Sequence, residues 1–408
     1  VPPVLPQETL PSPSCVRCGA CMTVCPLYGL LGRETAVARG KLNLLEAWQE
    51  GRLISNKTFE DIISCCLLCG ACTDKCAAGL ETPELIKAAR ARLNQDGRIW
   101  HPAVLLAQLT WQAPHLIPLA APLAPLINRI KLWVGRDSGL MWRLFPHLSA
   151  AVQEFPNPAR RPLRSQVPRR LPGRSSVKIA FFVGCGLEAL YPEAGLAFLS
   201  ICRRLGLDVV IPPGQGCCGL LSESVGQREI AVQQARRFVQ EFGAIKADYV
   251  VTACASCSYQ LKRAGRVLAE TPQAEEALRL AARVREASEF LVQDADYHPA
   301  FRFRDAKVVF HDPCHLHRGQ GISAEPRALL REALQTELVE PPEKKCCGLS
   351  GAFGVMYPKL SADLGRARSL TFAEAGAGLV ATSCTGCLAQ LARALPVGQV
   401  VHLMELIC

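Results

Sequence analysis

Apolar residues in the first part of the chain recur with the period of an α-helix. Three segments show this period: 39–50, 58–64 and 83–95. In the first of them, Leu42, Leu45 and Trp48 fall on one helical face. We therefore expect residues 1–98 to form a helical domain.

From residue 177 the pattern changes to short apolar runs that alternate with helical segments. Strands are expected at 177–183, 207–211, 249–252, 307–310, 337–340 and 379–381, and helices at 192–205 and 227–242. This alternation is typical of βαβ units with parallel strands, in which sites form beyond the carboxyl ends of the strands. The C-terminal region therefore predicts an α/β fold made of two similar halves.

The segment between these regions, residues 99–176, is predicted to be a connector. Its apolar part, Val104 to Val134, is broken by four prolines, whereas a membrane span needs about twenty apolar residues in a regular helix. We expect short helices that pack on the core or on a partner subunit. A membrane-surface role is the alternative.

The end of the connector, residues 156–176, contains six arginines and no acidic residue. The arginines are Arg160, Arg161, Arg164, Arg169, Arg170 and Arg174. Among several prolines, this composition indicates a solvated linker. The alternative is a basic tether that lies on anionic lipid or on an acidic partner.

The cysteine content changes this picture most, because 21 of the 408 residues are cysteines. Disulfide frameworks belong to short secreted chains, and the first residues show neither the basic nor the apolar region of a secretory signal. We therefore expect reduced, metal-binding thiols in a cytoplasmic protein. The formal charge of +10 is dispersed and lacks an aromatic-rich face, which argues against nucleic acid as a partner.

Ten of the cysteines form one unit that occurs twice. In both copies the first cysteine precedes a Cys-Cys-Gly motif by 32 positions. A Cys-x-x-Cys motif begins 36 or 37 positions after the second cysteine of Cys-Cys-Gly. The copies are Cys185, Cys217, Cys218, Cys254 and Cys257, and Cys314, Cys346, Cys347, Cys384 and Cys387. Such agreement indicates a duplicated domain. Five thiols exceed the four that zinc needs, so we expect a larger metal centre in each copy.

Two further runs near the N-terminus have the C-x2-C-x2-C-x3-C spacing of bacterial two-cluster ferredoxins. In those ferredoxins the fourth cysteine of each run binds the other cluster. By that arrangement, Cys15, Cys18, Cys21 and Cys76 hold one cubane [4Fe-4S] cluster, and Cys66, Cys69, Cys72 and Cys25 hold the other. A pair of zinc knuckles is the alternative interpretation.

Three cysteines remain outside these four sets: Cys65, Cys202 and Cys408. We expect Cys65 and Cys202 to be buried thiols, and Cys408 has no evident role. Four polar residues surround Cys314: His311, Asp312, His315 and His317. They are either ordinary loop residues or donors of hydrogen bonds and protons to a metal centre. No nucleotide-binding motif is recognised, so no flavin, nicotinamide or nucleotide is expected on this chain.

The duplicated unit resembles the cysteine-rich CCG domains found in the B and D subunits of heterodisulfide reductase. Joined to a two-cluster ferredoxin domain, the chain is similar to the iron–sulfur subunits of glycolate oxidase and of D-lactate dehydrogenases, and the likeness includes Ala38-Arg39-Gly40-Lys41. The resemblance implies a helical ferredoxin-like domain followed by two α/β CCG domains, 177–298 and 299–408, related by a pseudo-two-fold axis. It also implies a non-cubane [4Fe-4S] centre in each complete five-cysteine unit.

This resemblance implies an electron-transfer subunit of a 2-hydroxy acid dehydrogenase. Iron–sulfur clusters do not accept hydride, so a partner subunit that contains FAD is expected to oxidise the substrate. The chain would pass electrons toward quinone or another carrier, either in the cytoplasm or at the inner face of the membrane. The alternatives are a disulfide reductase like heterodisulfide reductase and the iron–sulfur subunit of an anaerobic glycerol-3-phosphate dehydrogenase.

Overall fold

The structure is a computed structural model that describes residues 15–95, 158–300, 306–334 and 337–408. The apolar stretch from Val104 to Val134 lies outside the described residues. Within the described ranges, no helix combines the length and the apolar character that crossing a bilayer requires.

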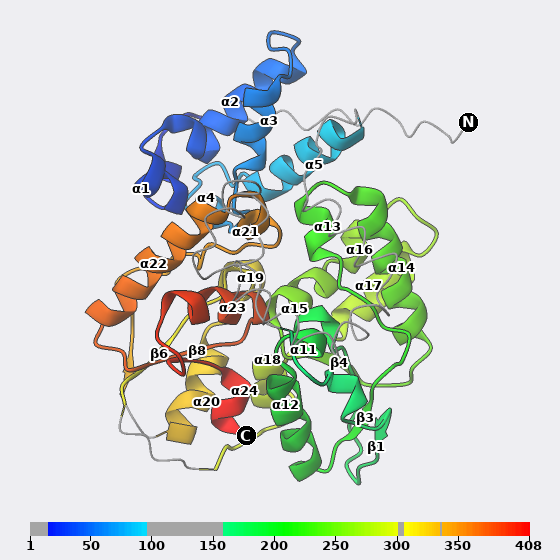
Figure 1. Cartoon of the computed structure of the whole chain (residues 1–408). Helices are drawn as coiled ribbons and strands as arrows, with labels where there is room; N and C mark the ends of the chain where they lie inside the picture. The colour runs from blue at the N-terminus through cyan, green and yellow to red at the C-terminus, as the bar shows by residue number, and fades with distance from the viewer. Residues whose placement is uncertain (1–14, 96–157, 301–305, 335–336) are drawn as a thin grey trace, which may run out of the picture.

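The N-terminal domain is helical, as predicted, and forms one end of the molecule (Figure 1). Its elements are η1 (Ala20–Met22), α1 (Pro26–Leu31), η2 (Glu34–Ala36), α2 (Ala38–Gln49), α3 (Lys57–Ser64), α4 (Ala71–Asp74) and α5 (Thr82–Gln95). The predicted helices correspond to α2, α3 and α5. Their apolar faces meet at Leu42, Ile63 and Ile86, all of which are buried.

The first half of the C-terminal region contains a sheet with the strand order β1-β3-β2-β4-β5. The strands are β1 (Arg170–Leu171), β2 (Lys178–Phe181), β3 (Asp208–Val210), β4 (Tyr249–Thr252) and β5 (Val284–Glu286). The helices are η4 (Leu163–Ser165), α11 (Gly184–Ala189), α12 (Pro192–Arg204), α13 (Leu220–Ser224), α14 (Arg228–Gly243), α15 (Ala255–Lys262), α16 (Ala264–Val267), α17 (Ala274–Ala282) and α18 (Ala287–Gln293). Strands β2 to β5 pair in parallel, as the alternating pattern predicts.

The second half repeats this arrangement with the strand order β7-β6-β8-β9, and all its pairs are parallel. The strands are β6 (Val308–Phe310), β7 (Leu338–Val339), β8 (Leu379–Thr382) and β9 (Val400–His402). The helices are α19 (Cys314–Gln320), α20 (Ala324–Leu334), α21 (Phe353–Met356), α22 (Pro358–Glu374), α23 (Thr385–Ala394) and α24 (Leu403–Ile407). The order matches β3-β2-β4-β5 of the first half, which confirms the duplicated α/β fold.

Residues 158–176, expected to belong to a solvated linker, are instead folded onto the first half. Strand β1 pairs antiparallel with β3, and Leu163 is fully buried in the core. Arg170 donates two hydrogen bonds to the Asp208 carboxylate, at 3.0 and 2.8 Å. Arg164 forms an ion pair with Glu188. This segment of prolines and arginines contains a two-residue strand and two core leucines, Leu163 and Leu171, so it is not a free basic tether.

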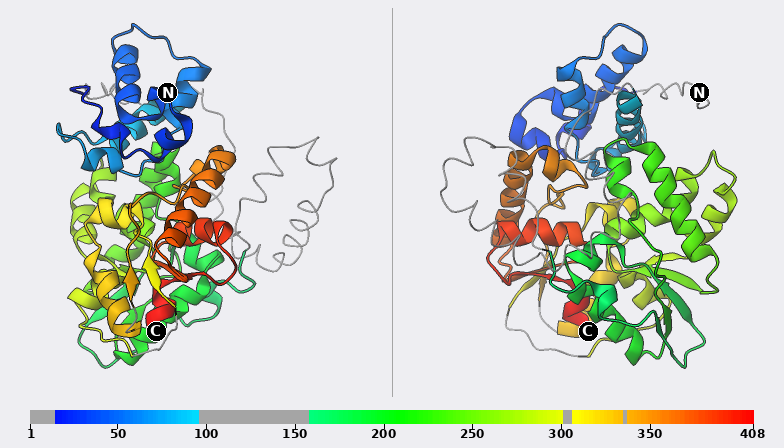
Figure 2. Two further views of the ribbon diagram at one scale, coloured as in Figure 1. Left: turned by 90° about the vertical axis from the view of Figure 1, so that its left-hand side faces the viewer. Right: turned by 45° about the vertical axis from the view of Figure 1, so that its right-hand side comes forward.

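The N-terminal domain lies across both halves, as the three ribbon views show (Figures 1 and 2). It is attached to the first half by ion pairs between Glu84 and Arg263, at 2.6 Å, and between Lys87 and Glu223, at 2.9 Å. On the second half, Arg318 pairs with Asp74 at 3.0 Å, and the Tyr357 hydroxyl donates to Asp61 Oδ1 at 2.9 Å. The domain is therefore held over the junction of the two halves.

Candidate metal centres

The cysteines of the duplicated unit gather beyond the carboxyl ends of the parallel strands, as expected for sites in such sheets. Cys185 follows β2 as the second residue of α11, and Cys254 is the N-cap of α15 after β4. In the second half, Cys314 begins α19 after β6, and Cys384 is the N-cap of α23 after β8. The equivalent strands thus carry equivalent thiols.

The structure brings the five thiols of the first half together. Cys217 interacts with both Cys185 and Cys218, and Cys257 interacts with both Cys218 and Cys254. Hydrogen bonds from Cys217 and Cys257 lower the pKa of Cys218 to about 6. Hydrogen bonds from Cys257 and Cys384 likewise hold the pKa of Cys254 well below its usual value. A connected set of thiols with two stabilised thiolates has the donor chemistry that iron and other thiophilic metals need.

The five thiols of the second half are brought together in the same way. Cys314 and Cys347 both interact with Cys346, and their hydrogen bonds hold the pKa of Cys346 well below its usual value. The Sγ atoms of Cys347 and Cys387 are 3.4 Å apart. Cys384 interacts with Cys387 and completes the set.

Exposure separates the two sets. Cys185 is exposed, whereas its counterpart Cys314 is buried, with 7% of its surface exposed. Cys314 and Cys346 belong to an apolar cluster that also contains Leu27, Ala36 and Leu67 of the N-terminal domain. The N-terminal domain therefore covers the thiols of the second half.

His311 is the polar neighbour of Cys314 that faces the thiols. It is fully buried, and one donor atom from each of His311, Cys347 and Cys387 lies within 4.8 Å of the others. Burial and the nearby Arg368 guanidinium lower the pKa of His311 to about 3, so the imidazole is neutral. Its Nδ1 accepts a hydrogen bond from Arg368 Nε at 3.4 Å, so the proton lies on Nε2. That N–H has no partner among the described residues.

The other three polar neighbours of Cys314 have different roles. The Asp312 carboxylate accepts two hydrogen bonds of 2.7 Å from Arg327. His315 Nδ1 lies 3.0 Å from the Ser256 hydroxyl, and its ring stacks on Tyr259. His317 is only partly buried. The expectation of hydrogen bonds to the metal centre therefore points to His311.

The two thiol sets meet at the joint between the halves. Ser256, inside the first Cys-x-x-Cys motif, places its hydroxyl 3.1 Å from Cys384 Sγ, and Thr385 Oγ1, inside the second motif, lies 3.3 Å from Cys254 Sγ. Cys254 also interacts directly with Cys384. A Cβ on Gly186 would lie 2.2 Å from Thr385 Oγ1, so this close approach requires glycine. Sequence reasoning missed Ser256 and Thr385, because the variable positions of a motif carry no signal of their own.

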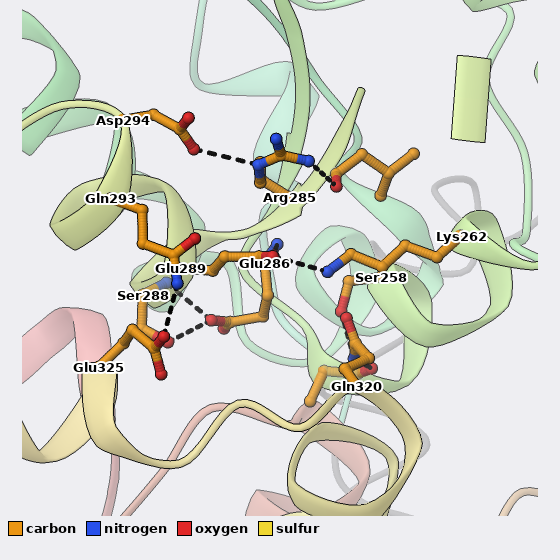
Figure 3. Close-up of polar contacts among 12 residues, drawn as sticks. Ser258, Lys262, Arg285, Glu286, Ser288, Glu289, Gln293, Asp294, Gln320 and Glu325 are labelled. Atoms are coloured by element: carbon orange, nitrogen blue, oxygen red, sulfur yellow. Dashed lines mark hydrogen bonds and ion pairs between the residues drawn. The ribbon is translucent and has the colours of Figure 1, made fainter. Parts of the chain in front are cut away.

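Helix α15, which carries the first Cys-x-x-Cys motif, is anchored on both sides (Figure 3). Lys262 near its end pairs with Glu289 of α18 at 2.7 Å. Gln320 of α19, in the second half, donates to Ser258 Oγ at 2.9 Å. Glu286 caps α18 by accepting the Ser288 N–H. These contacts fix the orientation of the motif relative to both halves.

The two N-terminal runs adopt the same backbone. Arg17 and Leu68, which precede the second cysteine of each run, both have left-handed φ values, 57° and 52°. Gly19 and Gly70, which follow it, have φ values of 83° and 75°. Left-handed residues other than glycine are uncommon and are retained at constrained functional loops. Such turns aim backbone N–H groups inward at an anion, which fits a loop wrapped around an anionic cluster.

Thiols of the two runs interact with one another, and the crossed arrangement itself stays a prediction. Burial raises the pKa of the Cys25 thiol, and Cys66 of the other run raises it further. Cys72 interacts with Cys66 and Cys25, and also with Cys21 of the first set. The two sets are therefore neighbours. The assignment of Cys76 to the first set stays a prediction.

The second N-terminal set also reaches the second half. Burial raises the pKa of Cys69, and the next contribution comes from Cys346. Cys314 in turn interacts with Cys69. The thiols of the two domains are thus close enough to influence one another across the interface.

Sequence reasoning did not recognise one glycine-rich motif. Residues 214–219 have the spacing G-x-G-x-x-G and lie between β3 and α13. Two of its variable positions are Cys217 and Cys218, and a Cβ on Gly214 would lie 2.1 Å from the Glu241 carboxylate. A dinucleotide pyrophosphate would meet that acidic group, so the segment fits a thiol loop rather than a dinucleotide site.

Cys65 and Cys202 are buried, as predicted, whereas Cys408 is partly buried. Sequence reasoning missed two buried cations of the N-terminal domain that have no carboxylate partner among the described residues, Lys41 and Arg90. A third buried cation, Lys87, pairs with Glu84 and Glu223. The helical period gave a usable signal for both: Lys41 falls on the same face as Leu42 and Leu45, and Arg90 follows Ala89 on the buried face of α5.

Two family models match the chain. The model described as a 4Fe-4S dicluster domain matches residues 12–80, and the one described as a cysteine-rich domain (CCG) matches residues 179–262 and 308–392. The two CCG matches coincide with the two halves of the C-terminal region.

Three curated proteins illustrate the similarity. The probable glycolate oxidase iron-sulfur subunit of Bacillus subtilis is 28% identical over 93% of this chain and 88% of its own length. The glycolate oxidase iron-sulfur subunit of Escherichia coli is 26% identical over 93% of this chain and 90% of its own length. Lactate utilization protein A of Geobacillus kaustophilus is 30% identical over 56% of this chain and 97% of its own length.

Proposed function

Because the chain belongs to the family of iron–sulfur proteins in which a 4Fe-4S dicluster domain precedes cysteine-rich CCG domains, we propose that it is the electron-transfer subunit of a flavin-dependent 2-hydroxy acid dehydrogenase. Its substrate is of the glycolate or D-lactate type. A partner subunit with FAD oxidises the substrate, and this chain relays the electrons toward quinone or another carrier.

The observation that carries this proposal is the arrangement of the thiols in one series. The series starts at the exposed Cys18 and ends at the exposed Cys185. Successive sets are joined by neighbouring cysteines: Cys21 with Cys72, Cys69 with Cys346, and Cys384 with Cys254. A chain with redox centres at these places and exposed thiols at both ends is suited to carry electrons between two partners.

We propose that four metal centres occupy this series. Two cubane [4Fe-4S] clusters are held by Cys15, Cys18, Cys21 and Cys76, and by Cys66, Cys69, Cys72 and Cys25. Two non-cubane [4Fe-4S] centres are held by Cys185, Cys217, Cys218, Cys254 and Cys257, and by Cys314, Cys346, Cys347, Cys384 and Cys387. When bound, such clusters accept and release single electrons.

The division of labour with a flavoprotein follows from electron counting. Oxidation of a 2-hydroxy acid to a 2-oxo acid removes two electrons and two protons, and FAD takes up the electron pair with a hydride. A relay that carries one electron at a time then returns the flavin to its oxidised form in two steps. The residues of this chain bury the thiols, exclude water and donate N–H groups to sulfur, as Gly348 N–H does to Cys346 Sγ at 3.5 Å.

A second candidate function is favoured by a small cavity at the meeting point of the three domains. Its lining includes Lys87, Tyr259, His315 and Ser350, and His315 contacts the joint through Ser256. The cavity has room for about one water molecule, so a disulfide would bind at its opening and not inside it. A disulfide reductase of the heterodisulfide reductase type would need such access to the joint of the two five-thiol sets.

Anaerobic co-purification from cells that express the chain with its natural partners distinguishes the two. The proposal expects a flavoprotein in the complex and bleaching of its flavin absorbance by glycolate or D-lactate. Bleaching by glycerol 3-phosphate alone would select the glycerol-3-phosphate dehydrogenase alternative. Absence of any flavoprotein, together with thiol-forming cleavage of a disulfide by the reduced chain, would select the reductase and contradict the proposal.

A further inference from the structure

Two buried cations lie beside the second N-terminal thiol set. The Lys41 side chain belongs to α2, and the Arg90 side chain belongs to α5; their residues are 1% and 4% exposed. Neither of them is paired with a carboxylate among the described residues. Burying a charge without a counter-charge is unfavourable, so a buried cation of this kind needs a source of negative charge nearby.

All the hydrogen bonds that these two cations make with described residues go to backbone carbonyl groups. Lys41 Nζ donates to Thr35 O at 2.9 Å and to Ile62 O. Arg90 donates to Ile63 O, to Ser64 O at 2.7 Å, to Cys66 O at 2.9 Å and, across the domain interface, to Ser224 O. The cations therefore bind the chain immediately before Cys66 and at Cys66 itself.

These contacts offset the negative electrostatic potential at the C-terminal end of α3. The helix ends at Ser64, so its last carbonyl groups, with the negative end of the helix dipole, lie next to Cys65 and Cys66. An anionic metal centre at Cys66 would be repelled by that end. Lys41 and Arg90 bind those carbonyl groups and place positive charge at that end of the helix.

The electrostatics of Lys41 identify the thiols as its counter-charge. Burial lowers the pKa of Lys41, and the largest influence that opposes this is Cys66, followed by Cys65 and later by Cys25. Cys66 likewise makes the largest opposing contribution for Arg90, whose pKa is also lowered by burial. Both cations thus lie where they would interact favourably with Cys66 once it binds a metal as a thiolate.

The first N-terminal set has no equivalent pair of cations among the described residues. Among the cations around it, Arg39 interacts with Cys21 and Cys15 but forms a hydrogen bond of 2.6 Å with Glu34. Glu34 is half exposed, so this ion pair is also screened by solvent. The charge of Arg39 is therefore largely compensated, whereas the charges of Lys41 and Arg90 are not.

We propose that Lys41 and Arg90 are the fixed counter-charges of the iron–sulfur cluster held by Cys66, Cys69, Cys72 and Cys25, and that they raise its reduction potential above that of the other cubane. This inference rests on the proposed function, because it needs a cluster at those cysteines. Both residues act on the cluster through their charge and not as ligands. An electron taken up by the chain then resides preferentially on the second cubane, next to the second half.

The test is an anaerobic redox titration of the full chain followed by EPR. Lys41→Met and Arg90→Met should each make reduction of the second cubane at least about tenfold less favourable, which is about 59 mV for a one-electron couple. The potential of the first cubane should stay unchanged. Lys41→Arg and Arg90→Lys keep the charge and should restore most of the potential, although they alter the hydrogen bonds.

Arg92→Gln is the matched control, because Arg92 lies two residues from Arg90 on the same helix but stacks on Trp48 at the surface. It should leave both potentials unchanged. If Lys41→Met does not fold, Arg90→Met compared with Arg90→Lys makes the same test. A Cys69→Ser variant identifies which EPR signal belongs to the second cubane.

The outcomes separate this inference from the function on which it rests. If Cys69→Ser removes one cubane signal but neither methionine variant shifts its potential, the counter-charge role is wrong and the ligand assignment stands. If Cys69→Ser leaves both cubane signals intact, the ligand assignment itself is wrong. A shift of equal size in the charge-keeping variants would mean that hydrogen bonding, and not charge, sets the potential, and would also overturn the inference.

Discussion

The two halves of the C-terminal region place equivalent thiols in different surroundings. In the first half, Cys185 is exposed, and Phe182, three residues before it, packs against Phe238 and Phe242. In the second half, Cys314 is covered by the N-terminal domain, and the residue three positions before it is His311. The duplicated strand order fixes where the thiols lie, but what packs on them differs.

This difference suggests different tasks for the two sets. The second set is enclosed, interacts electrostatically with Cys69 of the N-terminal domain and lies beside the His311 imidazole, whose Nε2–H has no partner among the described residues. The first set has an exposed thiol and only apolar residues at the equivalent place. We expect the second centre to pass electrons inside the protein, and the first to exchange them with an external partner.

The largest effects should come from removing a matched ligand in each half. Cys217→Ser and Cys346→Ser should each cost about four iron atoms per chain and lower turnover with the natural acceptor by at least about a hundredfold. Cys346→Ser should also lower the melting temperature more, because Cys346 belongs to the cluster shared with the N-terminal domain. Anaerobic iron and sulfide analysis, turnover assays and thermal unfolding measure these changes.

Cys408→Ser is the control for both variants, because Cys408 lies outside the four sets. It should keep the full iron content. If wild-type protein saturates at two clusters and both ligand variants behave like it, metal centres in the C-terminal region are ruled out.

His311→Phe gives the second half the side chain that the first half has at the equivalent position, Phe182. It removes the Nε2–H, which we expect to donate a hydrogen bond to a bound centre and to stabilise its reduced, more negative form. Its reduction potential should fall by about 59 mV, the equivalent of a tenfold change for one electron. EPR-monitored titration measures this shift. His317→Gln is the control and should leave the reduction potential unchanged. An unchanged potential in His311→Phe would contradict the proposal that His311 donates an N–H to the second centre.

Exposure predicts a difference in resistance to oxygen. In air, the centre at Cys185 should be lost before the centre at Cys314, because oxidants and chelators reach an exposed thiol more easily. Sequential EPR spectra of an aerated sample, with the Cys217→Ser and Cys346→Ser variants to assign the signals, measure the order. Loss of both centres at one rate would show that the cover over the second half gives no protection.

The smallest effects concern two equivalent helix caps, Glu286 before α18 and His402 before α24. Burial raises the pKa of Glu286 to about 7, from an ordinary value of 4.5, so its stabilising contribution is lost as the pH rises through this range. Burial lowers the pKa of His402 to about 4, from 6.5, so stability is lost as the pH falls through that range.

Glu286→Gln should therefore gain stability relative to the wild type between pH 5 and 7.5, by roughly 2–3 kcal/mol. His402→Asn should gain relative stability between pH 6.5 and 4 instead. Thermal unfolding of both variants and the wild type across this pH range measures the two trends. Trends of the same sign would show that these caps do not titrate as their burial requires.

The sequence was sufficient to predict the α/β halves and the grouping of ten thiols, because a duplicated spacing and alternating apolar runs both depend on local structure. The helices around Leu42 and Ile86 were predicted for the same reason. By contrast, the folded segment around Leu163 was missed, since a two-residue strand that pairs with a distant partner leaves almost no periodic signal.

The different environments of the two thiol sets could not be predicted from the sequence. They depend on contacts such as Glu84 with Arg263 and Asp74 with Arg318, which join residues far apart in the chain. Among the polar residues near Cys314, only the fold shows that His311 faces the thiols and His315 the joint. Lys41 and Arg90 were predictable in part, as charged residues at apolar positions of a helix.

The contact of Gly186 with Thr385, and of Ser256 with His315 and Cys384, has a consequence for how such a protein can be divided. Each half supplies a surface on which the cysteine motif of the other half rests. If the two halves were expressed as separate chains, each would expose the surface that the other half covers. Each would then need the other half to bury that surface. The duplication thus created two mutually dependent partners in one polypeptide, and separation of their genes would require their continued co-expression.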